Sequence, residues 1–322
     1  MAYTSFSDIY DPIKISKIVG DSWILDTAIL KSGIAKRDAS ANGGSLSYTL
    51  RDRKFQDVSG QNVKAGGTIS TVGNSQIKVT HPIIFKDAGM EESDVLEMIK
   101  EKSAPSVNAD MATSIKNAAS QFLDSSMISC IEGVAAALTD NKTGSGAIVD
   151  GAGLLAAKGI LGERGLMLNG GGMLMRSDMY FKLGALGLVA MTANTFGNNF
   201  QNQVVLQGQL PTNVLGLTPI ISDKCTDLGS NKDYIYLIGS EAMTIKGNEA
   251  PTIESAKLTA VKKRGTVTLF GVSYGIGFDG VTWGLAGKED VSDVELATSG
   301  NWSLSYSSSN QVVLARFYTA TA

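Results

Sequence analysis

The sequence predicts an α+β fold, in which one or two β-rich lobes surround a long helix. Apolar and polar residues alternate over residues 46–51, the pattern of a half-buried strand. Apolar residues then recur at helical spacing from Asn108 to Leu138. Short apolar segments, bounded by glycine and polar residues, follow between residues 204 and 318. No internal repeat is evident, so repeat architectures are not indicated.

Composition excludes several classes of protein. The chain has 322 residues, of which 43% are apolar, and a net charge of −3, so it is not a disordered chain. Its 36 glycines have no three-residue period, which excludes a collagen-like chain. Only 18% of residues are charged, against ~25% in typical proteins. Much of the surface must therefore be covered by small polar residues or by other protein.

The sequence also limits compartment and partners. The N-terminus has no basic start followed by an apolar stretch, so no secretory signal is predicted. The longest apolar run, residues 183–193, is shorter than the ~20 residues that cross a bilayer, and we expect a soluble protein with no membrane partner. Cys130 and Cys225 are expected to be buried free thiols. The basic clusters are short, which argues against sequence-specific binding of nucleic acid.

The first 90 residues predict an arm followed by a hairpin. Residues 1–35 show weak periodicity, and we expect them to dock on another surface. Residues 36–90 predict a long β-hairpin, with strands at 46–51, 69–72 and 77–79 and a polar tip between them. Few of its residues are apolar, and an isolated hairpin is marginally stable in water. It is therefore expected to lean on another surface.

Residues 93–140 predict two helices. Ser93 is expected to cap a short helix, and Pro105 to separate it from a long one that Ser106 or Asn108 caps. A helix from Asn108 to Leu138 would be ~45 Å long, either as a core helix or as the spine of an elongated subunit. Its predicted apolar stripe consists of Met111, Ile115, Ala118, Phe122, Leu123, Met127, Ile131, Val134 and Leu138.

Residues 151–190 contain ten glycines and predict short elements. We expect a helix at 152–161, strands at 166–168 and 173–175, and a helix over 179–188 capped by Ser177 and Asp178. A polar loop is predicted at 193–203. The remaining strands are predicted at 204–206, 218–221, 234–238, 257–261, 267–278 and 312–318.

No arrangement of residues typical of an enzyme is found. His81 is the one histidine, and it is expected to be structural. Residues 147–156 contain a relaxed form of the glycine pattern that binds dinucleotides, without the second strand–helix–strand unit that such a site needs. The pairs Glu91–Glu92 and Glu289–Asp290 are interpreted as solvated charge in polar loops. No catalytic, cofactor-binding or metal-binding residue is assigned, and a non-enzymatic role without a cofactor is expected.

The order of elements resembles that of the major capsid proteins of tailed bacteriophages, which have the HK97-like fold. Three local segments, 208–222, 277–283 and 295–302, are similar to strands and turns of that family. The resemblance implies four parts. They are an N-terminal arm (1–35), an E-loop hairpin (36–90), a P-domain with the spine helix (91–150 and 246–322) and an A-domain (151–245).

The resemblance implies a structural protein that self-assembles, through pentamers and hexamers, into the icosahedral capsid around a double-stranded DNA genome. It implies a virion location after synthesis in the bacterial host cytoplasm. Scaffolding, portal and decoration proteins are further implied partners, and packaged DNA would be contacted without sequence specificity. The implied assembly residues at the E-loop tip are Arg51, Arg53, Lys54, Asp57 and Lys64.

Two alternatives remain at this point. One is an encapsulin-like cellular compartment of the same fold, which would hold cargo proteins. The other is a soluble α+β enzyme that binds a nucleotide at residues 147–156.

Overall fold

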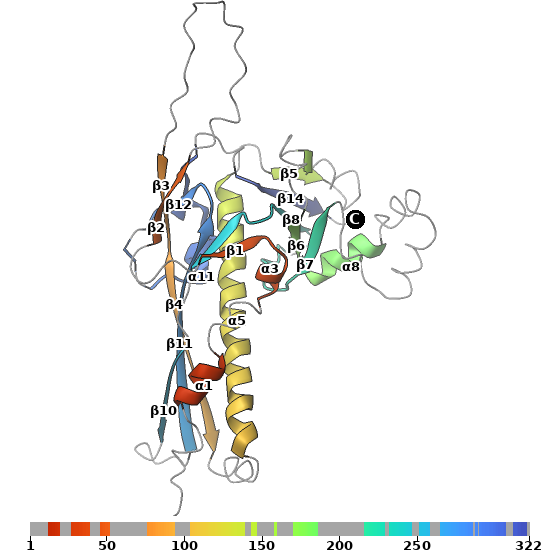
Figure 1. The fold of residues 1–322 in the computed structure, drawn as a ribbon. Helices are drawn as coiled ribbons and strands as arrows, with labels where there is room; N and C mark the ends of the chain where they lie inside the picture. Colours follow the sequence, from red (N-terminus) through yellow and green to blue (C-terminus); the bar gives the residue numbers. More distant parts are fainter. Residues whose placement is uncertain are drawn as a thin grey trace, which may run out of the picture.

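The protein is elongated, as Figure 1 shows. A long arm consists of one β-sheet and a helix, and a second β-sheet lies beside one end of this arm. The computed structural model describes the following residues: 12–19, 27–38, 46–51, 76–93, 104–138, 143–146, 158–159, 170–185, 216–228, 232–246, 251–257, 265–285, 287–288, 290–306 and 312–320.

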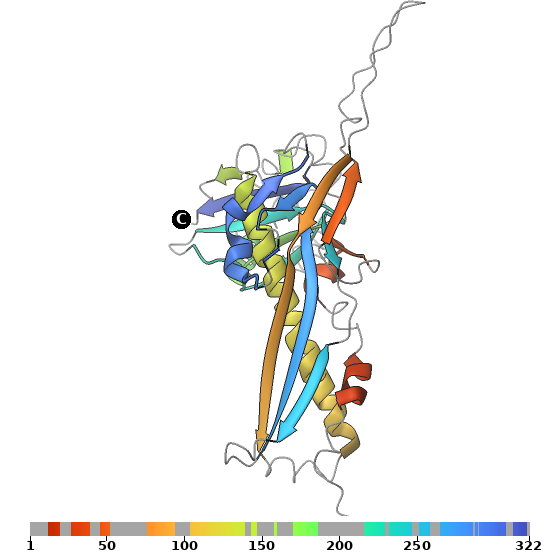
Figure 2. The ribbon, with the colours of Figure 1, turned by 90° about the vertical axis from the view of Figure 1, so that its left-hand side faces the viewer.

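The arm is a narrow antiparallel sheet that runs along a helix. Its strands are β4 (Ile83–Ser93), β10 (Thr252–Lys257) and β11 (Gly265–Phe278). β11 lies between the other two, pairing with β4 from Gly265↔Ser93 to Gly275↔Ile83 and with β10 from Thr266 to Gly271. Figure 2 shows the three strands side by side along the arm. Alternate residues point to the helix, so that Ile84, Val272 and Tyr274 are buried there.

The helix behind this sheet is α5 (Ala104–Ala137), the predicted spine, whose 34 residues span about 50 Å. Most of the predicted stripe is buried, including Ile115, Leu123, Met127, Ile131 and Val134. The expected start at Ser106 or Asn108 is wrong, because α5 already begins at Ala104. Pro105 lies in the first turn, where backbone N–H groups have no acceptor within the helix, so the N–H that proline lacks costs no hydrogen bond there.

The predicted helix cap at Ser93 is also wrong. Ser93 is the last residue of β4, because β11 continues far enough to pair with it. Glu91 and Glu92 lie in the same strand rather than in a polar loop. The rest of the expected short helix lies outside the described residues.

The second sheet has the strand order β5-β14-β8-β6-β7. Its strands are β5 (Thr143–Gly146), β6 (Gly171–Met175), β7 (Leu217–Ile221), β8 (Lys232–Ile238) and β14 (Leu314–Ala320). α8 (Ser177–Ala185) follows β6, and its Met179 and Tyr180 pack with Met173, Met175 and Ile235 in a separate small core. This sheet thus includes β5 and β14, which come from outside residues 151–245.

The described parts of the N-terminal arm dock on the chain itself. α1 (Pro12–Val19) places Ile15 and Val19 in the core beside α5 and β10. Thr27 caps α3 (Ala28–Lys31) by accepting the backbone N–H of Leu30. β1 (Ala35–Asp38) then adds in parallel to β9 (Met243–Lys246).

The predicted hairpin is confirmed by β2 (Leu46–Arg51) and β3 (Gln76–His81), which pair antiparallel from Leu46↔His81 to Arg51↔Gln76. Both strands lie at the end of the arm nearest the second sheet (Figure 1). The predicted strand at 69–72 lies outside the described residues.

The C-terminal part packs against the spine. It contains β12 (Val281–Trp283), β13 (Trp302–Leu304), α11 (Asp293–Ala297) and the 3₁₀ turn η6 (Ser299–Asn301). Ser292 caps α11 with a complete capping box to Glu295. The indole of Trp302 donates to the carbonyl of Leu296 at 2.7 Å, directly beside Gly133 of α5.

Most other strand predictions agree with the structure. Strands at 173–175, 218–221, 234–238, 267–278 and 312–318 correspond to β6, β7, β8, β11 and β14, within a few residues. The strand predicted at 257–261 overlaps β10 at Lys257, and residues 258–261 lie outside the described residues. The earlier residues of β10 pair with β11 in a register that buries Ile253. The predicted elements at 152–157, 160–161, 166–168 and 193–206 lie outside the described residues.

Candidate functional site

The predicted assembly residues lie in and beyond the hairpin. Arg51 is the last residue of β2 and faces Gln76 in the register. Arg53, Lys54, Asp57 and Lys64 lie outside the described residues. Of the five predicted assembly residues, the structure therefore describes Arg51, and the assembly role of the other four stays a prediction.

His81 has the structural setting that the sequence predicts. It is buried at the end of β3, and its Nε2 lies 3.1 Å from the carbonyl oxygen of Phe278, to which it donates. Gly277 lies against the imidazole, where a Cβ would fall 2.3 Å from the ring. Burial is the main cause that lowers the pKa of His81 to about 4, so the ring is neutral at pH 7.

The two thiols are free and buried, as predicted. Burial raises the pKa of Cys130, and burial with the nearby Glu132 raises that of Cys225 to about 12. Both are thus protonated and weakly reactive in the folded protein. Among the described residues, no group of three or more His, Cys, Asp or Glu is placed to hold a metal ion. None of the described helices combines the length and apolar character that a bilayer crossing requires.

The glycine pattern at 147–156 lies outside the described residues, as does Glu289. Two features of the described residues are candidates for function.

One candidate is the outward face of the arm. Phe85 of β4 is 58% exposed and Leu269 of β11 is 49% exposed, although both lie in the regular part of the sheet. Asp87, Gly89, Leu269 and Gly271, with Thr252 and Glu254 of β10, line a hollow of about 460 Å³. Exposed apolar side chains beside carboxylates around a hollow in a sheet are typical of a surface that another protein covers. We call this surface, with Phe85, Asp87, Glu254 and Leu269, the arm face.

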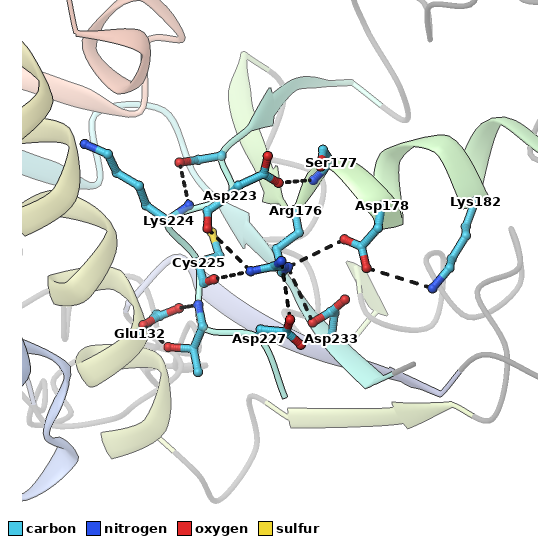
Figure 3. A network of polar contacts seen from close by, with 12 residues as sticks. Glu132, Arg176, Ser177, Asp178, Lys182, Asp223, Lys224, Cys225, Asp227 and Asp233 are labelled. Atoms are coloured by element: carbon cyan, nitrogen blue, oxygen red, sulfur yellow. Dashed lines mark hydrogen bonds and ion pairs between the residues drawn. The ribbon is translucent and has the colours of Figure 1, made fainter. Parts of the chain in front are cut away.

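A second candidate is a polar network at the start of α8, which Figure 3 shows. Arg176, between β6 and α8, donates through Nη1 to the carbonyl of Cys225 at 2.9 Å. Asp178, Asp227 and Asp233 surround the same guanidinium at 3.5–4.0 Å. Asp223 accepts the backbone N–H of Ser177 at 3.0 Å, and the side-chain and backbone hydrogen bonds from Ser177 lower its pKa.

This network was not predicted. Its members come from the β6–α8 junction, the loop after β7 and the start of β8, which are separated by up to 57 positions, from 176 to 233. No motif joins them, so only the sheet order β8-β6-β7 brings them together.

The loop after β7 is also attached to the spine. Glu132 of α5 accepts the backbone N–H of Thr226 at 2.6 Å and its hydroxyl at 2.8 Å. Burial raises the pKa of Glu132, an effect that these two hydrogen bonds partly offset. The second sheet and the arm are thus joined through a buried carboxylate, next to the Arg176 network.

The sequence matches no family model and no curated protein. The fold, in contrast, matches solved structures over most of its length. The capsid of cyanophage Pam1 is 9% identical, with 90% of this chain and 89% of that chain covered, at a TM-score of 0.56. The acid-stable capsid structure of Helicobacter pylori bacteriophage KHP30 is 9% identical, with 90% and 88% covered, at 0.53. A structure from Gordonia phage Cozz is 13% identical, with 92% and 87% covered, at 0.51. The chain therefore has the HK97-like fold of phage capsid structures, as the sequence predicted.

Proposed function

We propose that this chain is a major capsid protein of a tailed phage, which self-assembles into an icosahedral shell around double-stranded DNA. The observation that carries the proposal is the likeness of its fold to the cyanophage Pam1 capsid over 90% of the chain. In this proposal the protein has a structural role rather than an enzymatic one. It is made in the bacterial host cytoplasm and resides in the virion, with scaffolding, portal and decoration proteins as further partners.

The division into N-terminal arm, E-loop, P-domain and A-domain belongs to the same proposal. The arm with α5 corresponds to the P-domain and spine, and the sheet with α8 to the A-domain. We extend the A-domain sheet to include β5 and β14, because β14 pairs with both β5 and β8.

The shape of the subunit is consistent with a shell. A long, thin arm offers much lateral surface for its size, and contacts that repeat by symmetry close such tiles into a particle. The low content of charged residues, 18%, supports extensive coverage by neighbouring copies.

We further propose that the hairpin tip of one copy lies on the arm face of another. The segment from Arg51 to Lys64 carries four basic residues of the predicted interface, whereas the arm face carries Asp87 and Glu254 beside exposed Phe85 and Leu269. Opposite charges around an apolar centre suit a specific, repeated contact.

The test is electron microscopy and sedimentation of the purified full-length chain across a range of concentrations, with and without co-expressed phage structural proteins. Closed particles of uniform size, or rings of five and six subunits, are the expected products. A strict monomer or small dimer under all of these conditions would overturn the proposal.

The contents of the particles separate the alternatives. A phage shell produced with its packaging proteins holds DNA, whereas an encapsulin-like compartment holds cargo protein. The nucleotide-binding alternative predicts saturable binding that Gly153→Val abolishes, and we expect no binding for either form.

A further inference from the structure

Two glycines lie on the outward face of the arm sheet, in the interior of its strands. Gly89 of β4 pairs with Leu269, and Gly271 of β11 pairs with Asp87, in the uninterrupted ladder between these two strands. On its other side Gly271 pairs with Thr252 of β10. Glycine weakens the interior of a strand, because it has no side chain to pack and loses the most freedom on folding. Both glycines therefore require a physical reason.

The fold of the subunit does not supply this reason. Neither glycine has the positive φ that other residues rarely adopt. At Gly277, further along β11, the buried ring of His81 leaves no room for a Cβ. At Gly271, in contrast, the described atoms within 4 Å of a Cβ all belong to the carboxyl group of the exposed Asp87. At Gly89 the nearest atom is Cδ2 of the exposed Leu269, at 2.8 Å. Both glycines thus border the surface rather than the core.

The missing side chains form the hollow in the arm face. Phe270 also lines this hollow, although its side chain is buried against Phe122 of α5, so the floor of the hollow is backbone. Asp87 and Glu254 supply carboxylates from the two strands that flank β11. Phe85 lies two residues before Asp87 in β4 and is exposed on the same face. The result is a slot with a flat peptide floor, a carboxylate on either side and an aromatic ring beside it.

We propose that this slot receives an arginine side chain of a second copy, Arg53 of the hairpin tip, and that Gly89 and Gly271 determine the fit of the contact. The inference rests on the proposed capsid function, in which the hairpin tip lies on the arm face. A guanidinium is planar, so it lies flat on a peptide floor, donates two parallel hydrogen bonds to Asp87 and stacks on Phe85. Lysine has no planar group that would fit such a slot.

Charge and position select Arg53 as the occupant. Residues 51–64 contain four basic and two acidic residues, so their net charge is opposite to that of the slot. Of the two arginines in this segment, Arg51 ends β2 and pairs with Gln76 in the ladder to β3, whereas Arg53 comes after the end of that strand. Arginine is also enriched at the centres of protein contacts, where lysine is depleted.

The test measures the protein concentration that the full-length chain needs for assembly, together with its melting temperature. Gly271→Ala places a methyl group on the floor of the slot, and we expect assembly to require about ten times more protein. The melting temperature should stay the same or rise, because the Asp87 carboxyl can turn aside and alanine suits a strand better than glycine. Gly300→Ala is the matched control. No described atom lies within 4 Å of its Cβ position, it lies outside the slot, and its assembly should be unchanged.

A double-mutant cycle tests the occupant of the slot. Arg53→Ala should also raise the assembly concentration about tenfold, and Arg53→Lys should recover little of this loss. The protein that carries both Arg53→Ala and Gly271→Ala should assemble no worse than either single variant, because both changes remove the same contact. A loss of about a hundredfold in the double variant would mean that the two positions act independently, and it would overturn the assignment of the arginine.

Gly271→Ala assembling at the wild-type concentration would overturn the proposal. An unfolded Gly271→Ala protein would overturn it as well, since the fold itself would then require the glycine. Gly89→Ala provides a second variant, because its Cβ meets only the flexible end of Leu269 at close range. It should also raise the assembly concentration, and an unchanged value would refute the slot. Failure of the wild-type chain to assemble would instead refute the proposed capsid function, and this contact with it.

Discussion

Glu132 holds Thr226 with both oxygens of one carboxylate, accepting its backbone N–H at 2.6 Å and its hydroxyl at 2.8 Å. The two residues are 94 positions apart in the chain. Glu132 is a buried charged residue of α5, and this contact compensates for much of the cost of removing its charge from water.

The first prediction concerns this contact. Thr226→Val keeps the shape of the side chain but removes the hydroxyl, which leaves one oxygen of Glu132 without that donor. We expect the free energy of unfolding to fall by about 1–2 kcal/mol, measured by urea denaturation. Thr226→Ser retains the hydroxyl and is the control. Equal losses in the two variants would show that the hydrogen bond is not the cause.

The second prediction concerns the close approach of α5 to α11. A Cβ at Gly133 would fall 2.0 Å from the Leu296 carbonyl oxygen and 2.7 Å from the Trp302 indole nitrogen. Gly133→Ala should therefore destabilise the protein by about 2 kcal/mol or more, although alanine favours helix. Gly159 is also helical, and among the described residues no atom beyond its own turn lies within 4 Å of the position that a Cβ would take there, so Gly159→Ala should be neutral or slightly stabilising. Thermal unfolding of both variants measures these two changes in stability, and a Gly133→Ala protein as stable as the wild type would contradict the close contact.

The third prediction concerns pH and His81. The pKa of His81 is about 4 in the folded protein and ~6.5 in an unfolded chain. As pH falls below 6.5, the unfolded state binds the proton first, so stability is lost between pH 6.5 and 4, by roughly 3 kcal/mol at the lower limit. His81→Gln, which can still donate to the Phe278 carbonyl, should lack this component when unfolding is measured across the range. Because His81 is the one histidine in the sequence, NMR of its imidazole gives the pKa directly, and a value near 6.5 would contradict the buried, neutral ring.

The fourth prediction concerns the hairpin. Deletion of residues 54–67 should leave a folded subunit that no longer forms shells, because this segment has too few apolar residues to belong to a core. Circular dichroism would report folding, and sedimentation would report assembly. Global unfolding of the deleted protein would contradict the assignment as an assembly loop.

The fifth prediction tests where the hairpin docks. Asp87→Lys with Glu254→Lys should raise the protein concentration needed for assembly by about tenfold, because like charges would then meet at the contact. Adding Arg53→Glu and Lys54→Glu to the same chain should restore assembly. Failure of the charge swap to restore it would place the partner of the hairpin elsewhere.

Local patterns predicted those elements that carry their own periodicity. The stripe from Met111 to Leu138 predicted the spine, and the alternation at 46–51 predicted β2. β5 (Thr143–Gly146) has no apolar residue and is a strand only because β14 lies beside it. For the same reason β4 extends to Ser93, because pairing with the long strand β11 outweighs the polar character of the local sequence.

The candidate site was less predictable than the fold. The charges of the hairpin tip could be named from sequence, but their partner could not, since it depends on a neighbouring copy. The Arg176 network needed the sheet order to bring Asp178 and Asp233 together. In contrast, the burial of His81, Cys130 and Cys225 followed from their apolar or strand-end setting.

The pairing of β4 with β11 runs over eleven consecutive residue pairs without interruption. Hydrogen bonds in an antiparallel ladder lie perpendicular to the strands. Tension along the arm would thus load them together in shear, rather than opening them one after another as in peeling. β3 runs into β4 with only Pro82 between them, so a pull on the hairpin reaches this ladder directly. Under the proposed capsid role, this pairing would let the arm bear tension in a shell wall that is under pressure from within.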